Sequence, residues 1–84
     1  MKTFTTYKNT AHLLREARKA RGLTMRQMSI RYHKDKSVYA HLELGQRVPK
    51  SIAALIEIAH DYEIEPRRLL DAVIMDLDLE EAMG

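Results

Sequence analysis

The sequence predicts an all-α domain of five helices. Its 84 residues suffice for one domain, and its apolar residues recur every three or four positions. Helix-capping residues precede several of these apolar runs, namely Thr24, Asp35 and Ser51. A chain of this length buries only about 60–65% of its unfolded surface, so we expect dimerisation to add to its stability.

The charge of the chain is divided unevenly. Residues 1–50 hold twelve Lys or Arg and three Asp or Glu, a net charge of +9, whereas residues 51–84 hold two and nine, a net charge of −7. This asymmetry indicates a polyanionic partner for the first part and a different role for the second. The plain alternative is a solvated surface that is merely uneven. We favour the polyanion because the basic part contains the two-helix motif described below.

Composition and spacing argue against several classes of protein. The chain has no cysteine, hence no disulfide framework, which fits a reducing cytoplasm. No apolar run reaches the roughly 18–20 residues of a membrane span, and we expect no signal peptide after MKTFTTYK. No cofactor-binding or catalytic motif appears, and no metal site is expected from the histidines or the acidic C-terminal end. We therefore expect neither a cofactor nor an enzyme.

The N-terminal part is expected to be an arm followed by a helix. Residues 1–8 are rich in Thr and aromatic residues and would form a flexible arm or a short strand. A helix should begin at Asn9 or Thr10 and end near Gly22. Its apolar stripe consists of Leu13, Leu14, Ala17 and Ala20.

Residues 24–45 read as two short helices joined by a tight turn. Thr24 is a good N-cap for the first, and Asp35 is a good N-cap for the second. Tyr39 and Leu42 lie three apart on the inner face of the second helix, which Gly45 should terminate. Two such helices separated by three or four residues form the plan of a helix-turn-helix.

Two further helices are predicted after residue 50. Ser51 should cap the first, with Ile52, Leu55, Ile56 and Ala59 inside and a connector from Tyr62 to Glu65. Pro66 suits the first position of a helix over 66–83, whose inner stripe would be Leu69, Leu70, Val73, Ile74 and Leu77. A second stripe comprises Ala72, Met75, Leu79 and Met83. Two stripes predict that this helix meets another chain, unless its end simply frays.

Several residues give the chain a resemblance to a known family. They are Arg18, Gly22-Leu23-Thr24, Met28, Asp35, Leu42-Glu43, Gly45 and Arg47. In these residues the chain resembles the Cro/repressor-type helix-turn-helix family, also called the xenobiotic-response-element family. The resemblance extends over about Thr10 to Leu70 and needs no gap between Thr24 and Gly45.

The resemblance implies double-stranded DNA as a partner and assigns roles to particular residues. Base edges would be read by Lys36, Ser37 and His41, with Ala40 at the contact surface. Phosphates would be met by Thr24, Arg26, Gln46 and Arg47. The fold that it implies is a five-helix repressor-like domain, with Arg18 and Glu43 as a structural ion pair. Independently of the resemblance, the second apolar stripe of the last helix would form the dimer face, through Ala72, Met75, Leu79 and Met83.

Four positions depart from the family pattern. Met25 stands where the family usually has Gln, and Leu44 stands where a polar phosphate contact is common. His33 replaces the common turn glycine. Lys34 replaces an apolar residue, so its stem would cover apolar surface while its ammonium reaches water.

Two functions therefore compete. The first is a sequence-specific DNA-binding regulator, most simply a repressor, acting as a homodimer on an inverted repeat. The second is a protein-interaction module, such as an antitoxin or antirepressor, that binds a protein partner through the acidic C-terminal half. Met25, Lys34 and Leu44 modestly favour the second.

Overall fold

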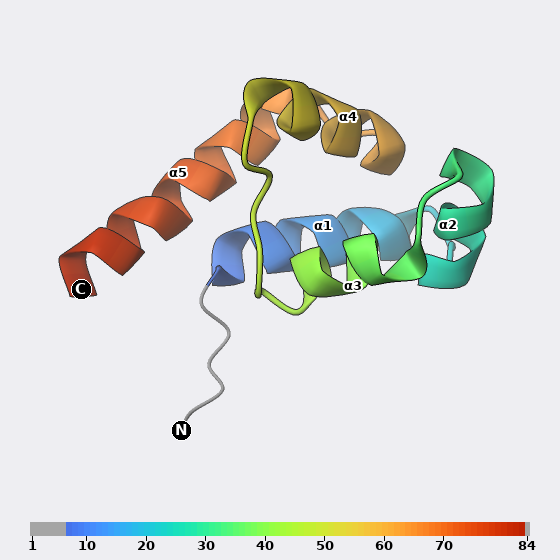
Figure 1. The fold of residues 1–84 in the computed structure, drawn as a ribbon, viewed down its shortest axis with the longest axis horizontal. Helices are drawn as coiled ribbons and strands as arrows, with labels where there is room; N and C mark the ends of the chain where they lie inside the picture. The colour runs from blue at the N-terminus through green and yellow to red at the C-terminus, as the bar shows by residue number, and fades with distance from the viewer. Residues whose placement is uncertain (1–6, 84) are drawn as a thin grey trace.

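The computed structural model describes residues 7–83, with side chains as far as residue 78. The described chain forms five helices and no strand (Figure 1), which confirms the predicted all-α class. The helices are α1 (Lys8–Ala20), α2 (Met25–Tyr32), α3 (Lys36–Glu43), α4 (Ile52–Tyr62) and α5 (Pro66–Met83). The predicted arm falls mostly on residues 1–6, outside the described residues. The first helix begins at Lys8, slightly earlier than predicted.

Helix α1 lies at the centre of the fold. It packs against α3 on one side and against α5 on the other, while α4 and α5 meet at a corner (Figure 1). Side chains from all five helices form one core, whose buried members are Leu14, Met28, Tyr39, Leu42, Leu55, Ile58, Ala59, Tyr62, Leu69 and Val73. Ala20, which was expected in the apolar stripe of α1, is exposed at the end of that helix.

Local capping chemistry explains where the middle helices begin. The side chain of Thr24 accepts a hydrogen bond from the backbone N–H of Gln27. In return, the side chain of Gln27 accepts one from the backbone N–H of Thr24. The side chains of Asp35 and Ser51 also cap α3 and α4, by accepting the backbone N–H groups of Ser37 and Ala54. These caps confirm the helix starts predicted from the sequence.

Left-handed residues end α2 and α4. His33 has φ 57° and ψ 44°, and its neighbour Lys34 donates its backbone N–H to the carbonyl of Ser29 at 3.1 Å. Glu63 has the same backbone angles after α4. A non-glycine residue in this region costs some stability, although His is tolerated better than most. The turn between α2 and α3 is therefore tight despite its missing glycine.

The buried face of α4 differs from the predicted one. Ile52 and Ile56 are 63% and 49% exposed, whereas Ile58 and Tyr62 are buried with Leu55 and Ala59. The helix is turned in this way because Asp61 and Tyr62 on its last turn make polar contacts with α3. The predicted connector also began too early, since Tyr62 is the last residue of α4.

The buried face of α5 is likewise turned from the prediction. Leu69 and Val73 are buried as expected, but Ile74 and Leu77 are 46% and 41% exposed. In their place α5 buries Asp76, whose carboxylate accepts the backbone N–H of Thr10 at 2.7 Å. A polar residue thus belongs to the inner face of α5 because the start of α1 supplies its hydrogen-bond donors.

Candidate nucleic-acid interface

The outer face of α3 is polar at its N-terminal end. Lys36 and Ser37 are exposed, and Ala40 and His41 are half-buried, while Tyr39 and Leu42 point into the core. The backbone N–H of Ser37 hydrogen-bonds the Asp35 carboxylate at 3.0 Å and lowers the pKa of that carboxyl. The cap is therefore ionised at neutral pH and fixes the first turn, which presents Lys36 and Ser37 to solvent.

Exposed polar residues flank α3 on two sides. Arg26 lies on the first turn of α2, and Gln46 and Arg47 follow α3 after Leu44 and Gly45. Thr24 is exposed as well, but its N–H is already bonded to the side chain of Gln27 at 2.8 Å. The anion-attracting N–H groups at this helix end are therefore those of the next residues, Met25 and Arg26.

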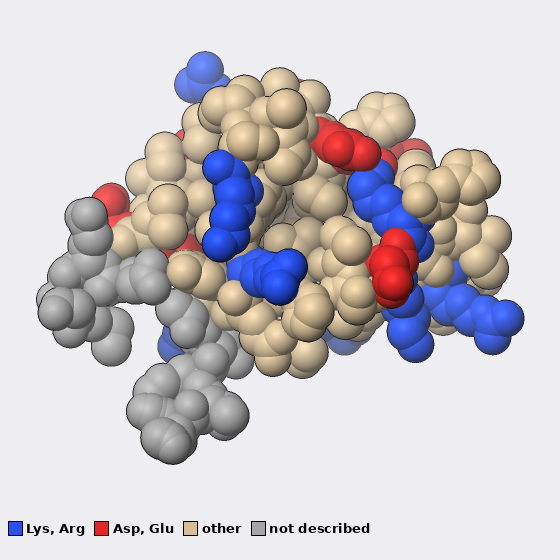
Figure 2. All heavy atoms as spheres, in the orientation of Figure 1, with Lys and Arg blue, Asp and Glu red and all other residues tan. Residues whose placement is uncertain are grey.

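Positive charge gathers around α3 in the view of Figure 2. Lys and Arg side chains lie at the lower right, over the α2–α3 region, and near the centre, over the segment that leads from α3 to α4. Between these two groups most of the surface is uncharged, and acidic side chains lie along the inner side of the right-hand group. An α-helix bordered by cations on both sides suits a major groove, which is bordered by phosphates on both sides.

A buried ion pair fixes the C-terminal end of α3. Arg18 Nη2 lies 2.8 Å from Glu43 Oε1, and Arg18 Nε donates to the same carboxylate at 2.9 Å. The hydroxyl of Tyr62 donates to Glu43 Oε2 at 2.7 Å. The hydrogen bond with Glu43 raises the pKa of Arg18. Burial raises the pKa of Tyr62, and its hydrogen bond with Glu43 raises that pKa further. The carboxylate of Glu43 on α3 is thus bonded to a charged donor on α1, Arg18, and to a neutral phenol on α4, Tyr62.

A second polar cluster holds the turn that precedes α3. Lys34 Nζ lies 2.7 Å from Asp61 Oδ2 and 2.9 Å from Glu57 Oε2. Burial lowers the pKa of Lys34, but the hydrogen bonds with these two carboxylates outweigh it, and the pKa is raised. The expectation that this ammonium reaches water is wrong, because α4 supplies two acidic partners that sequence reasoning missed.

A comparison with protein families identifies this arrangement. A family model described as a helix-turn-helix domain matches residues 11–73. The chain belongs to the helix-turn-helix family. This family consists of DNA-binding regulatory domains of the xenobiotic-response-element type, so the resemblance seen in the sequence is confirmed and the protein is a DNA-binding regulator. No curated protein and no solved structure matches the chain.

The last helix of this helix-turn-helix protein carries exposed apolar side chains on two flanks. Met75 is 54% exposed, and Ala72 on the same flank is half-buried. Ile74 and Leu77 occupy the other flank. The side chains of Leu79 and Met83, predicted for the dimer face, lie outside the described ones. Both flanks of α5 thus border the buried strip formed by Leu69, Val73 and Asp76.

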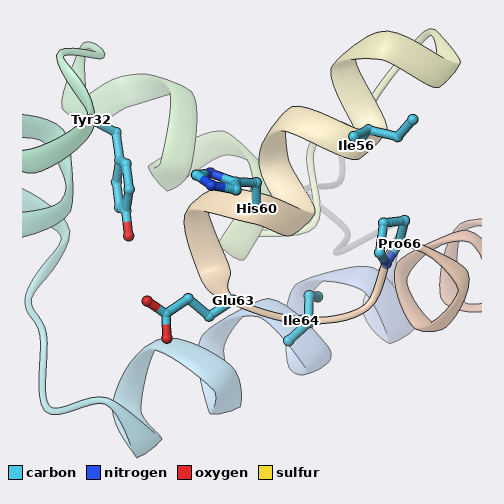
Figure 3. Close-up of a pocket in the computed structure, with 6 residues that line it drawn as sticks. All are labelled: Tyr32, Ile56, His60, Glu63, Ile64 and Pro66. Atoms are coloured by element: carbon cyan, nitrogen blue, oxygen red, sulfur yellow. The ribbon is translucent and has the colours of Figure 1, made fainter.

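A hollow of about 350 Å³ lies away from α3, where α2, α4 and the α4–α5 corner meet (Figure 3). It is lined by Tyr32, Ile56, His60, Glu63, Ile64 and Pro66. One of these lining residues, Glu63, forms an ion pair with Arg21 at 3.2 Å.

Within residues 7–78 no cluster of His, Asp or Glu could hold a metal ion. None of the described helices is long and apolar enough to cross a membrane.

Proposed function

We propose that this helix-turn-helix protein is a transcriptional regulator, most simply a repressor, that binds an inverted-repeat operator as a homodimer. The observation that carries the proposal is the exposed, polar first turn of α3, which presents Lys36 and Ser37 to solvent within the basic half of the chain. A protein that occupies its operator in this way blocks the same DNA to other proteins.

The residue types on α3 suit direct reading of bases. The Lys36 ammonium donates to guanine O6 or N7, and the Ser37 hydroxyl both donates and accepts. Further along the helix, His41 offers a ring nitrogen, and the methyl group of Ala40 fits against a thymine methyl. Their partial burial places these two side chains closer to the body of the protein than Lys36 and Ser37.

Phosphate contacts would set the register of α3 in the groove. The N-terminus of α2 offers backbone N–H groups and the positive end of a helix dipole, beside Arg26. Gln46 and Arg47 offer the matching contacts after α3, where Leu44 lacks a polar group. These contacts contribute affinity without sequence preference, and salt weakens them.

Base-reading and phosphate-binding variants should behave differently. We expect Lys36→Ala and Ser37→Ala to cost about 1–3 kcal/mol each on an operator selected from random DNA and to relax its sequence preference. Arg26→Ala and Arg47→Ala should weaken all duplexes alike and lower the salt slope by about one each. Fluorescence anisotropy at several salt concentrations measures both effects.

Arg67 provides a control for these variants, because it is an exposed arginine at the start of α5. Arg67→Ala removes the same charge as the phosphate variants but should leave the affinity nearly unchanged. If Lys36→Ala and Ser37→Ala alter neither affinity nor preference, α3 is not the reading helix.

The proposed homodimer would form through the flank of α5 that carries Ala72, Met75, Leu79 and Met83. In a two-fold dimer the same patch meets itself, so an apolar flank is covered by its own copy. The exposure of Met75 supports this proposal. Two copies of α3 would then stand about 34 Å apart, one turn of DNA.

Met75→Asp should convert the dimer into monomers, because two copies would bury like charges against each other. Analytical ultracentrifugation at micromolar concentration measures the change, with Leu79→Asp as a second variant. Ile74→Asp is the matched control, since Ile74 is similarly exposed on the other flank of the same helix. A monomeric wild type would refute the dimer. If Ile74→Asp dissociates the dimer and Met75→Asp does not, the interface lies on the other flank of α5.

A protein-interaction module is the second candidate. The exposure of Ile52 and Ile56 on α4, within the acidic half, favours it. Gel shifts of random DNA at two salt concentrations separate the two candidates. No binding at low salt would support the interaction module, whereas binding that salt weakens would support the regulator.

A further inference from the structure

The carboxylate of Asp61 connects the last turn of α4 to the helix-turn-helix. It is 4% exposed, and its Oδ2 atom accepts hydrogen bonds from Lys34 Nζ at 2.7 Å and from the hydroxyl of Tyr39 at 2.8 Å. Lys34 belongs to the turn between α2 and α3, and Tyr39 belongs to the buried side of α3. One oxygen atom thus holds both the turn and the helix that follows it.

The same turn of α4 is fixed on its other side. The backbone carbonyl of Asp61 accepts Arg21 Nη1 at 2.6 Å, and Arg21 Nη2 donates to the hydroxyl of Tyr32 at 2.9 Å. These bonds link the end of α1 and the end of α2 to the residue that holds α3. Because each contact joins different elements, the position of α3 depends on the end of α4.

We infer that Asp61 is a positioning residue for DNA recognition, through which α4 sets the angle at which α3 presents its outer face. This inference rests on the proposed function, since it concerns the reading of bases by α3. Tyr39 lies within one helical turn of Lys36 and Ser37 on one side and of His41 on the other. A displacement of its ring therefore moves the reading side chains together.

The chemistry of the cluster explains why an ionised carboxylate is required. Oδ2 of Asp61 accepts hydrogen bonds from the ammonium of Lys34 and from the phenol of Tyr39. Burial raises the pKa of Tyr39, and the hydrogen bond to Asp61 raises it further, so the phenol remains a donor. An amide in place of the carboxylate has nearly the same shape but no charge for Lys34. The amide oxygen can still accept from both groups, but without a charge it would hold the ammonium of Lys34 more weakly.

The test compares full-length Asp61→Asn with wild type on two duplexes, the selected operator and a scrambled sequence. We expect the operator affinity to fall about tenfold, the equivalent of one ordinary base contact. Affinity for the scrambled duplex should stay the same or rise slightly, because the variant loses a negative charge. Simple unfolding would instead lower both affinities in proportion, and such a result would overturn the inference.

Glu57→Gln is the matched control. Glu57 lies one turn earlier on α4, also contacts Lys34 Nζ, and removal of its charge changes the net charge equally, but its side chain is 61% exposed. We expect it to leave the ratio of operator to scrambled affinity unchanged. A ratio that falls equally in both variants would show a general charge effect and overturn the inference.

A second variant guards against a poorly folded Asp61→Asn. Lys34→Met removes the ammonium from the same carboxylate and places an apolar side chain in the turn. We expect the ratio to fall here as well, and an unchanged ratio in Lys34→Met and Asp61→Asn would overturn the role of the cluster. A wild type with equal affinity for both duplexes would refute the proposed function itself, which is a distinct outcome.

Discussion

Replacement of Glu43 with alanine is expected to destabilise the protein by about 3–5 kcal/mol. The Glu43 side chain is 2% exposed, and its two oxygens receive hydrogen bonds from the Arg18 guanidinium and the Tyr62 hydroxyl. Alanine would leave a largely buried cation and a buried phenol without their acceptor. Breaking one partner of such a pair costs more than the pair itself contributes, because the remaining charge stays desolvated.

The size of this effect matters for a chain of 84 residues. Proteins are stable by about 0.05–0.15 kcal/mol per residue, hence about 4–13 kcal/mol here. Glu43→Ala should thus remove a large share of the total, and the variant should be partly unfolded well below the wild-type melting midpoint. Urea denaturation followed by circular dichroism measures the loss, at one protein concentration because dimerisation would add to apparent stability.

Two comparisons isolate the ion pair. Glu16→Ala removes an exposed carboxylate from α1 and should change stability by no more than about 0.5 kcal/mol. In the double variant Arg18→Met/Glu43→Ala the uncompensated cation is gone, so it should be no less stable than Glu43→Ala alone. A loss in Glu43→Ala as small as that in Glu16→Ala would contradict the expected contribution.

Features that depend on neighbouring residues were predictable from the sequence. Thr24, Asp35 and Ser51 each bond an N–H two or three residues away, so their cap chemistry is readable without tertiary structure. The same holds for the exposed positions of α3, because Tyr39 and Leu42 define its inner face. The start of that helix and the exposure of Lys36 and Ser37 therefore followed from the sequence.

Buried polar residues on α4 and α5 were not predictable in this way. Asp61 is hydrogen-bonded to Tyr39 and Lys34, which lie 22 and 27 residues away in the sequence. Asp76 is hydrogen-bonded to Thr10, which lies 66 residues away. Their apolar neighbours Ile56 and Ile74 were placed inside, because hydrophobic spacing counts a carboxylate as a surface group. One signal was available, since a lysine at the usually apolar turn position requires a carboxylate nearby.

Asp76 illustrates how a distant carboxylate completes a helix. The N-cap residue of α1, Tyr7, makes no side-chain capping hydrogen bond. Asp76 of α5 takes its place, since Oδ1 accepts the backbone N–H and the side-chain amide of Asn9 at 2.9 Å each, and Oδ2 accepts the N–H of Thr10. The negative charge also lies at the positive end of the α1 dipole. The proposed dimer helix is thereby anchored to the centre of the fold.

Asp76→Ala is therefore expected to cost about 2–4 kcal/mol, because the buried backbone N–H of Thr10 and the partly buried N–H of Asn9 lose their acceptor, and an unsatisfied buried group costs about 1–3 kcal/mol. Hydrogen exchange should also speed up at the amides of Asn9 and Thr10 more than elsewhere in α1. Asp78→Ala is the matched control, since Asp78 is an exposed aspartate two residues along the same helix, and its removal should change stability by less than about 0.5 kcal/mol. Equal losses in the two variants, with unchanged exchange at Thr10, would show that the carboxylate of Asp76 does not stabilise the start of α1. A selective loss in Asp76→Ala would instead establish that α5 holds α1 in place.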